Sequence, residues 1–144
     1  MLVTKIVRLL ILKKQSTTLK MNLKTHKTTL LDQAKEFRDA YSVANSPSGT
    51  LIQKCLIDEE WSEFHEAFHL KDKHEQLKEL CDLVYVCYQF AANEGWDLDE
   101  AMDRVHKSNM SKLDENGQPI YRADGKVLKG PRYEPPNLKD LTDK

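Results

Sequence analysis

Hydrophobic residues recur every three or four positions along the middle of the chain, which is the spacing of amphipathic helices. The pattern predicts four helices, over about residues 29–44, 50–70, 75–94 and 98–111. Gly and Pro are few before Ser108, and no alternation with a period of two occurs before residue 112. We therefore expect no sheet in this part and an all-α fold with a four-helix core.

The pattern changes after residue 112. Asn116-Gly117 and Asp124-Gly125 are turn signals, and the second lies between two short apolar runs. They predict a small hairpin that pairs residues 120–122 with residues 126–128. The later stretch "YEPPNL" predicts an extended terminal segment, because the residue before a proline avoids helical geometry.

The first 14 residues, "MLVTKIVRLLILKK", are apolar and basic. Lys5 and Arg8 interrupt the apolar run, and no small-residue cleavage site follows, so the segment does not fit a signal peptide. It is also too short and too charged to span a bilayer. We interpret residues 1–27 as an N-terminal extension outside the core and residues 28–144 as one domain. A surface-lying amphipathic helix is the alternative for the extension.

Composition excludes some partners. The net charge is −1 in 144 residues, so no global field favours nucleic acid or a membrane surface. The three cysteines, Cys55, Cys81 and Cys87, are odd in number and lie inside apolar runs, which argues against a disulfide framework. We expect a reducing compartment, hence the cytoplasm.

Acidic residues cluster on the inner side of the second predicted helix. At about 100° per residue, Glu59, Glu60 and Glu63 share a sector with apolar positions. His65 and His69 project to the opposite, polar side. An adjacent stripe is largely aromatic and consists of Ile57, Trp61, Phe64 and Phe68.

The third predicted helix is apolar almost all round, yet it contains Glu79 and Asp82 on one face. A buried carboxylate must be paired, protonated or bound to metal. Two helices thus offer carboxylate pairs to a shared interior, where a divalent cation would remove their repulsion. Oxygen ligands alone favour Mg²⁺, with Mn²⁺ as a substitute, over zinc.

Three alternatives remain open from the residues. The stretch His65-Glu66-Ala67-Phe68-His69 fits the H-E-x-x-H signature of zinc proteases, although no third ligand is evident. The chain could also be a non-enzymatic helical dimerisation module whose acids pair with lysines. The third alternative is that Glu59, Glu60 and Glu63 form a solvated helix face and not a binding site.

The acidic pattern Glu59-Glu60-x-x-Glu63, followed by Glu79-x-x-Asp82, resembles that of the MazG-like, all-α nucleoside triphosphate pyrophosphohydrolases. Asn109-x-x-Lys112 and the tail "GQPIYRADGKVLKGPRYEPPNL" resemble the small single-domain bacterial and phage members. The resemblance implies Mg²⁺-dependent hydrolysis of (deoxy)nucleoside triphosphates to monophosphate and pyrophosphate. The family also includes enzymes that act on phosphoribosyl-ATP, so the substrate preference does not transfer.

The resemblance also implies residue roles. The metal ligands would be Glu60, Glu63, Glu79 and Asp82, with Glu59 behind them as a supporting carboxylate. Glu60 and Glu63 are both candidates for the general base. The resemblance makes Asn109 and Lys112 substrate-binding candidates, and their positions on the predicted helices add Lys54, Phe37 and Gln33. Of these, Lys54 has the weakest case, and Phe37 and Gln33 would line a base pocket or else be a core residue and an exposed residue.

Apolar side chains on nearly every side of the third helix, together with the aromatic stripe, exceed what a soluble monomer usually exposes. We therefore expect a homodimer or a homotetramer with nucleotide sites near subunit boundaries. The alternative is a monomer in which residues 1–20 fold back over the stripe.

Overall fold

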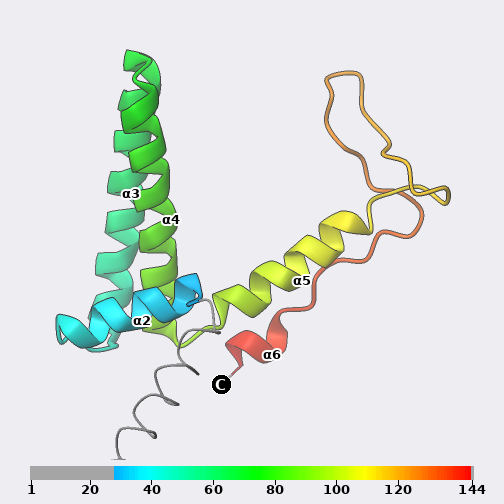
Figure 1. Cartoon of the computed structure of the whole chain (residues 1–144). Coiled ribbons are helices and arrows are strands. Elements are labelled where there is room, and N and C mark those ends of the chain that lie inside the picture. The colour runs from blue at the N-terminus through cyan, green and yellow to red at the C-terminus, as the bar shows by residue number, and fades with distance from the viewer. Residues whose placement is uncertain (1–27, 144) are drawn as a thin grey trace, which may run out of the picture.

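The computed structural model describes residues 28–143 and is all-α in this range. Its helices are α2 (Leu30–Ala40), α3 (Pro47–Leu70), α4 (Lys73–Glu94), α5 (Leu98–Met110) and α6 (Lys139–Thr142). Figure 1 shows α3 and α4 as an antiparallel hairpin whose lower end is crossed by α2. The expected extension, residues 1–27, lies outside the described residues.

The α3 helix begins earlier than the sequence pattern suggested. The Ser46 side chain caps it by accepting a hydrogen bond from the backbone N–H of Gly49 at 3.0 Å. Pro47 occupies the first helical turn, where a missing backbone N–H costs nothing. A Ser-Pro pair that reads as a helix breaker is therefore the start of α3.

The turn between α3 and α4 is shorter than expected. Lys71 adopts the left-handed conformation (φ 58°) and ends α3. Asp72 then caps α4 by accepting hydrogen bonds from the backbone N–H groups of His74 and Glu75 at 2.9 and 3.2 Å. The connector, predicted to span residues 71–75, therefore consists of Lys71 and Asp72. This short turn joins α3 directly to α4.

A small apolar core fixes α2 on the end of the hairpin. Leu31 and Ala34 of α2 pack against Tyr88 and Ala92 of α4, and Leu98 at the start of α5 covers them. The Thr29 side chain starts α2 through a capping box with Asp32. In this single chain α5 reaches the core only through its first turn, so the expected four-helix core is not formed within one chain.

A polar network locks the same end of the hairpin, and we call it the Arg38–Asn93 network (Arg38, Asn45, Ser46, Thr50, Asn93 and Glu94). The Arg38 guanidinium, 4% exposed, donates to Asn45 Oδ1 at 2.9 and 3.2 Å and to Asn93 Oδ1 at 3.0 Å. Asn93 in turn donates to the backbone oxygen of Ser46 at 3.0 Å. Position 49 must be glycine here, because a Cβ would lie 2.5 Å from Asn93 Oδ1.

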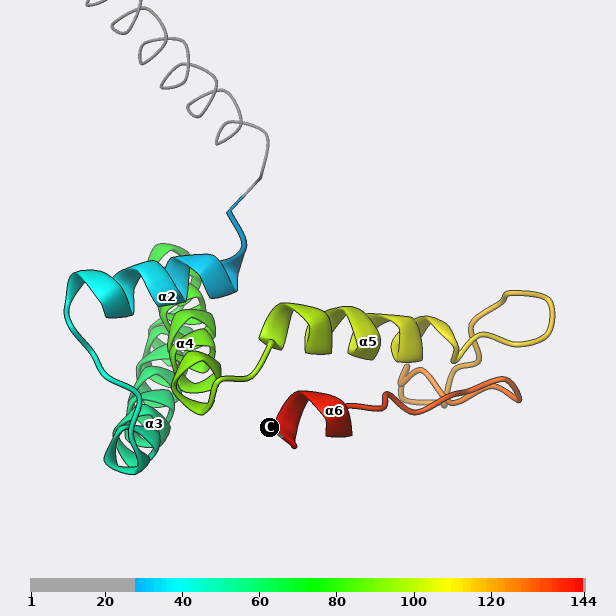
Figure 2. The ribbon, with the colours of Figure 1, turned by 90° about the horizontal axis from the view of Figure 1, so that it is seen from below.

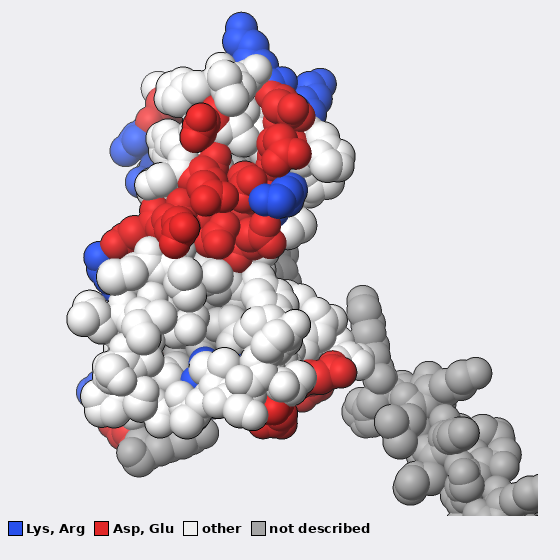
Figure 3. Space-filling model, turned by 90° about the vertical axis from the view of Figure 1, so that its left-hand side faces the viewer, with Lys and Arg blue, Asp and Glu red and all other residues white. Residues whose placement is uncertain are grey.

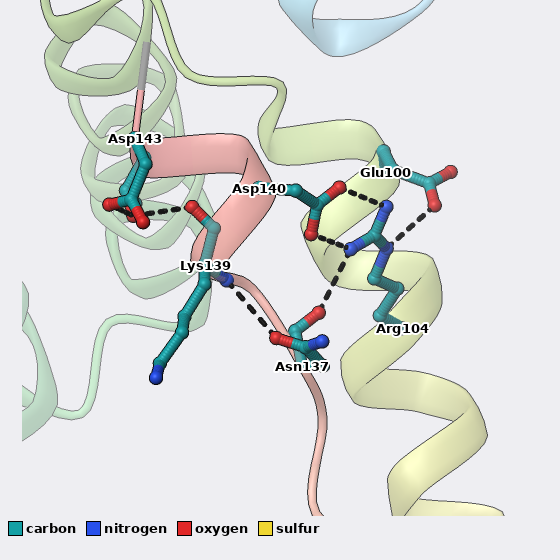
Figure 4. Close-up of polar contacts among 7 residues, drawn as sticks. Glu100, Arg104, Asn137, Lys139, Asp140 and Asp143 are labelled. Carbon is teal, nitrogen blue, oxygen red and sulfur yellow. Dashed lines mark hydrogen bonds and ion pairs between the residues drawn. The ribbon is translucent and has the colours of Figure 1, made fainter.

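α5 points away from the hairpin, and the tail returns along it to α6 (Figure 2). Arg104 of α5 ties this return down by donating to both Asp140 oxygens at 2.6 and 2.9 Å and to the backbone oxygen of Asn137 at 2.9 Å (Figure 4). Ser108 donates to the backbone oxygen of Glu134 at 2.7 Å. We call residues 98–142, which run from α5 to α6, the C-terminal arm.

The prediction of a β-hairpin near the tip of the arm is wrong, because its two segments do not form strands. The turn forms, and Tyr121 and Val127 make one isolated antiparallel bridge, but no strand is present between residues 28 and 143. Both side chains are exposed, and nothing packs on the pair as a third strand would. α6, which ends the arm, falls just after the extended segment and was not predicted.

Many large apolar side chains remain exposed within residues 28–143. They lie on both helices of the hairpin and on the arm, and they include Leu51, Ile52, Trp61, Phe68, Leu77, Leu80, Val84, Met102 and Met110. No helix in the described part of the chain combines the length and hydrophobicity that a bilayer crossing requires.

Candidate metal centre

Three carboxylates meet between α3 and α4. Glu60 projects from α3, and Glu79 and Asp82 project from α4; one oxygen of each lies within 4.8 Å of the other two. The antiparallel hairpin brings the middle of α3 opposite the first half of α4. Figure 3 shows acidic side chains massed over this part of the hairpin. We call Glu60, Glu79 and Asp82 the acidic cluster.

Glu79 is the buried member of the cluster, with 6% of its surface exposed. Its Oε1 accepts a hydrogen bond from Lys78 Nζ at 2.7 Å, and Lys78 also pairs with Asp82 at 3.3 Å. The other oxygen, Oε2, is buried and has no hydrogen-bond partner among the described residues. A carboxylate oxygen taken from water without a partner costs stability, so its position calls for a ligand.

The carboxylates also repel one another. The pKa of Glu60 is raised, first by burial and then by the charges of Glu63, Asp82 and Glu79. The pKa of Glu63 is raised mainly by the charge of Glu79, while Lys78 acts in the opposite direction. A divalent cation would reverse both effects, because it favours the ionised carboxylates.

The donors fit a hard divalent cation. Every ligand atom of the acidic cluster is a carboxylate oxygen, the type that Mg²⁺ and Mn²⁺ prefer. Mg²⁺–oxygen bonds are about 2.0–2.1 Å long, so ligands on opposite sides of one ion lie about 4.2 Å apart. Side-chain rotation would be needed to bring all three oxygens, which lie within 4.8 Å of one another, onto one ion.

The remaining acidic candidates lie beside the cluster. Glu63 is exposed and adjoins Glu79, as the cause of its raised pKa indicates. Glu59 is exposed, and its charge contributes to the raised pKa values of Glu60 and Glu63. Both are within electrostatic reach of the cluster without belonging to its closest set of oxygens.

The basic substrate-binding candidates lie elsewhere. Asn109 and Lys112 are at the far end of α5, which points away from the hairpin, and Lys112 Nζ donates to Asn109 Oδ1 at 2.7 Å (Figure 1). Lys54 is exposed on α3 and pairs with Asp58, one turn further on. Within a single chain, neither Lys112 nor Lys54 is brought to the acidic cluster.

Gln33 lines an apolar pocket of about 430 Å³ between α2 and α4, together with Leu30, Leu80, Cys81, Val84, Tyr85 and Tyr88. Phe37 does not line this pocket. It stacks on Tyr41 with ring centroids 4.4 Å apart and touches the edge of Tyr85 at 5.9 Å. Since Cys81 directly precedes Asp82, the pocket and the acidic cluster occupy the same stretch of α4.

His65 and His69 lie on the exposed side of α3, as the helical projection predicted. The acidic cluster is the sole group of three or more potential metal ligands found within residues 28–143, and neither histidine belongs to it. The zinc-protease interpretation therefore lacks its third protein ligand in the described chain.

Lys78 is the site residue that sequence reasoning missed. It precedes Glu79 and lies four residues before Asp82, a spacing at which a lysine can reach both carboxylates on one helix. The signal was present in the sequence, but a lysine beside acids is usually a solvated pair.

Comparison with known proteins identifies the helical region. The family model described as phosphoribosyl-ATP pyrophosphohydrolase matches residues 23–109, which include the whole hairpin and the acidic cluster. A search of curated proteins found no match. The match ends at Asn109, so Lys112 and the tail lie beyond it. The chain therefore belongs to the phosphoribosyl-ATP pyrophosphohydrolase family, part of the MazG-like all-α group of nucleotide pyrophosphohydrolases.

Proposed function

We propose that the chain hydrolyses (deoxy)nucleoside triphosphates between the α and β phosphates, with Mg²⁺ or Mn²⁺ held by Glu60, Glu63, Glu79 and Asp82. The observation that carries this proposal is the buried, unpartnered Oε2 of Glu79 among carboxylates from two helices. Bound there, the ion would offset phosphate charge and lower the pKa of a water molecule.

The protein's own groups account for the rest of the chemistry. Glu60 belongs to the acidic cluster and Glu63 lies beside it, so each offers a carboxylate next to the position of the ion. Either is suited to take the proton of the attacking water. Glu59 keeps the neighbourhood negative and so favours cation binding. Lys78 holds Glu79 and Asp82 on the same side of α4.

Phosphoribosyl-ATP is the second candidate substrate, and the family match favours it. Both substrates present a phosphoanhydride between α and β phosphates to the same carboxylates, and they differ in the group attached to the base. The pocket lined by Gln33, Tyr85 and Tyr88 is a candidate for binding that base.

The test is incubation of the full chain with each nucleoside triphosphate, each deoxynucleoside triphosphate and phosphoribosyl-ATP, with Mg²⁺, and separation of the products by chromatography. We expect monophosphate and pyrophosphate from one substrate class. Diphosphate and orthophosphate would show that the reaction class is wrong. No hydrolysis of any substrate, with Mg²⁺ binding intact, would favour the dimerisation module.

We propose further that a second copy completes the nucleotide site. Asn109 and Lys112 lie at the C-terminal end of α5, a helix that points away from the hairpin (Figure 1), and the hairpin and the arm both expose apolar surface. Exchange of arms in a homodimer, or in a tetramer of two dimers, would cover this surface and supply a lysine for the phosphates. The full chain should then show at least a dimeric mass in light scattering, whereas a monomeric mass would contradict the exchange.

Mixing two inactive variants tests the exchange directly. If Asp82→Asn and Lys112→Ala impair the same site from different chains, unfolding and refolding them together should restore about a quarter of the wild-type rate. That figure follows because half of the dimers are mixed and one of the two sites in each is intact. No recovery in dimers shown to be mixed would place both residues in the same chain's site.

A further inference from the structure

The histidine pair on α3 has no part in the proposed hydrolysis. His65 and His69 lie one helical turn apart, and their ring centroids are separated by 6.0 Å with an angle of 42° between the ring planes. Both belong to the unbroken helix Pro47–Leu70, so the spacing between their backbones is fixed. Both side chains are exposed and reachable from solvent.

Neighbouring aromatic rings orient the two imidazoles. Trp61 meets His65 edge-on, with ring centroids 4.7 Å apart, and Phe68 meets His69 in the same manner at 6.1 Å. Among the described residues, ring contacts are the sole interactions of the two imidazoles, with no hydrogen bond or ion pair. Their nitrogens are therefore free to coordinate an ion.

Two imidazoles at this spacing form a chelate. Histidines at positions i and i+4 lie on one helix face and can bind a single ion. Imidazole nitrogen suits Zn²⁺, Ni²⁺ and Cu²⁺, whereas Mg²⁺ prefers oxygen. We propose that His65 and His69 form a two-histidine surface site for these transition-metal ions, separate from the acidic cluster. Water completes the coordination, since no third histidine, cysteine or carboxylate joins the pair within residues 28–143.

The two sites have different chemistry and lie on different sides of α3. Glu60 faces α4, while the histidines face solvent. The proposal therefore does not depend on the enzymatic activity, and either can fail without the other. A bound ion would clamp the last two turns of α3, because it binds the folded helix in preference to the unfolded chain.

The test is calorimetric titration of the full chain with Zn²⁺ and with Cu²⁺, in excess Mg²⁺ that saturates the carboxylates. We expect one ion per chain at this site, with Cu²⁺ bound more tightly than Zn²⁺. Loss of an outer partner of a metal ligand already costs about 10–100-fold in affinity, so His65→Ala or His69→Ala should cost about that much or more. Zn²⁺ should also raise the melting temperature of the wild type but not of His65→Ala.

Two controls make the outcome decisive. His74→Ala removes an exposed histidine of α4 that has no histidine one turn away, and binding should be unchanged. Glu66→His combined with His69→Ala keeps the number of histidines but places them side by side, so binding should remain weak. Equal binding by the wild type and His69→Ala, or recovery in the rearranged variant, would overturn the two-histidine site.

Discussion

Two regions of the α3–α4 hairpin both bury charged groups, and they surround them in opposite ways. At the end crossed by α2, the positive charge of Arg38 is surrounded by oxygen acceptors from Ala44, Asn45 and Asn93. In the acidic cluster, the negative charge of Glu79 is surrounded by other carboxylates and meets one lysine. The Arg38–Asn93 network satisfies most of its groups internally, with Nη1 of Arg38 left over, whereas the acidic cluster accumulates like charge.

The difference distinguishes a polar cluster that satisfies itself from one that is suited to a ligand. Hydrogen bonds between complementary groups fix one arrangement and leave little for a ligand to add. Like charges held together by the fold lower stability, and a ligand of opposite charge restores it. Burial alone does not distinguish Arg38 from Glu79, since both are nearly inaccessible. The sign of the charges around each residue distinguishes them.

The largest effect is expected when one carboxylate of the acidic region is removed. Glu63→Gln or Asp82→Asn should lower the rate of hydrolysis by about a thousand-fold, since several kcal/mol of transition-state stabilisation are lost. The fold should survive and gain stability without metal, because repulsion falls. Glu66→Gln, an exposed glutamate on the same helix, is the matched control and should keep wild-type activity. Near wild-type rates in both variants would show that the site assignment is wrong.

The same kind of change in the Arg38–Asn93 network should act on stability instead. Asn93→Ala removes the hydrogen bonds that Asn93 makes with Arg38 Nη2 and with the backbone N–H and oxygen of Ser46, so the free energy of unfolding in urea should fall by about 3 kcal/mol. Activity per folded molecule should not change. Asn116→Ala, an exposed residue of the tail, should change stability by less than about 0.5 kcal/mol. A large loss of hydrolysis in folded Asn93→Ala protein would contradict the distinction between the Arg38–Asn93 network and the acidic cluster.

Mg²⁺ should reveal the acidic cluster without any assay of hydrolysis. At a concentration 100 times its dissociation constant, an ion that binds the folded state alone stabilises it by about 2.7 kcal/mol. The melting temperature of the wild type and of Asn93→Ala should therefore rise with Mg²⁺, whereas that of Asp82→Asn should hardly move. An equal rise in all three proteins would place the Mg²⁺ site elsewhere.

The smallest effect concerns Glu94, whose pKa is lowered by hydrogen bonds from Thr50 and Asn93. A lowered folded-state pKa contributes stability above the ordinary value of 4.5, and this is lost as the pH falls through the lowered pKa. Wild type should therefore be more stable than Glu94→Gln at pH 7, and the difference should shrink at pH 3. Urea unfolding at both pH values measures it, and a difference that grows on acidification would contradict the assigned direction.

Periodicity predicted the helices well, and the polar details escaped it for physical reasons. The acidic residues could be placed on facing helices because a helix repeats its sides at a fixed angle. The Arg38–Asn93 network could not be predicted, because it joins positions 55 residues apart. Neither an arginine nor an asparagine identifies its hydrogen-bond partner from the sequence alone.

The arm differed from prediction for another reason. Residues 98–111 carry a clear helical pattern, and α5 forms there. The pattern does not show what packs against the apolar side of this helix. The same limit applies to Lys78, whose sequence neighbours fit either a solvated pair or a buried carboxylate. The local sequence therefore predicted the helices, whereas the direction of the arm and the ion pairs of Lys78 depended on tertiary packing.

Lys78 also bears on how the acidic cluster chooses its ion. Its ammonium is tethered beside Glu79 and Asp82, so its effective concentration there far exceeds that of any free monovalent ion. Its pKa is raised by hydrogen bonds to these carboxylates, which keeps it charged. Potassium or sodium would gain little by entering, because a single positive charge is already in place. An ion with two charges and a demand for several oxygens is the kind that could still compete. A lysine that weakens binding in absolute terms would therefore also disfavour sodium and potassium at the proposed site.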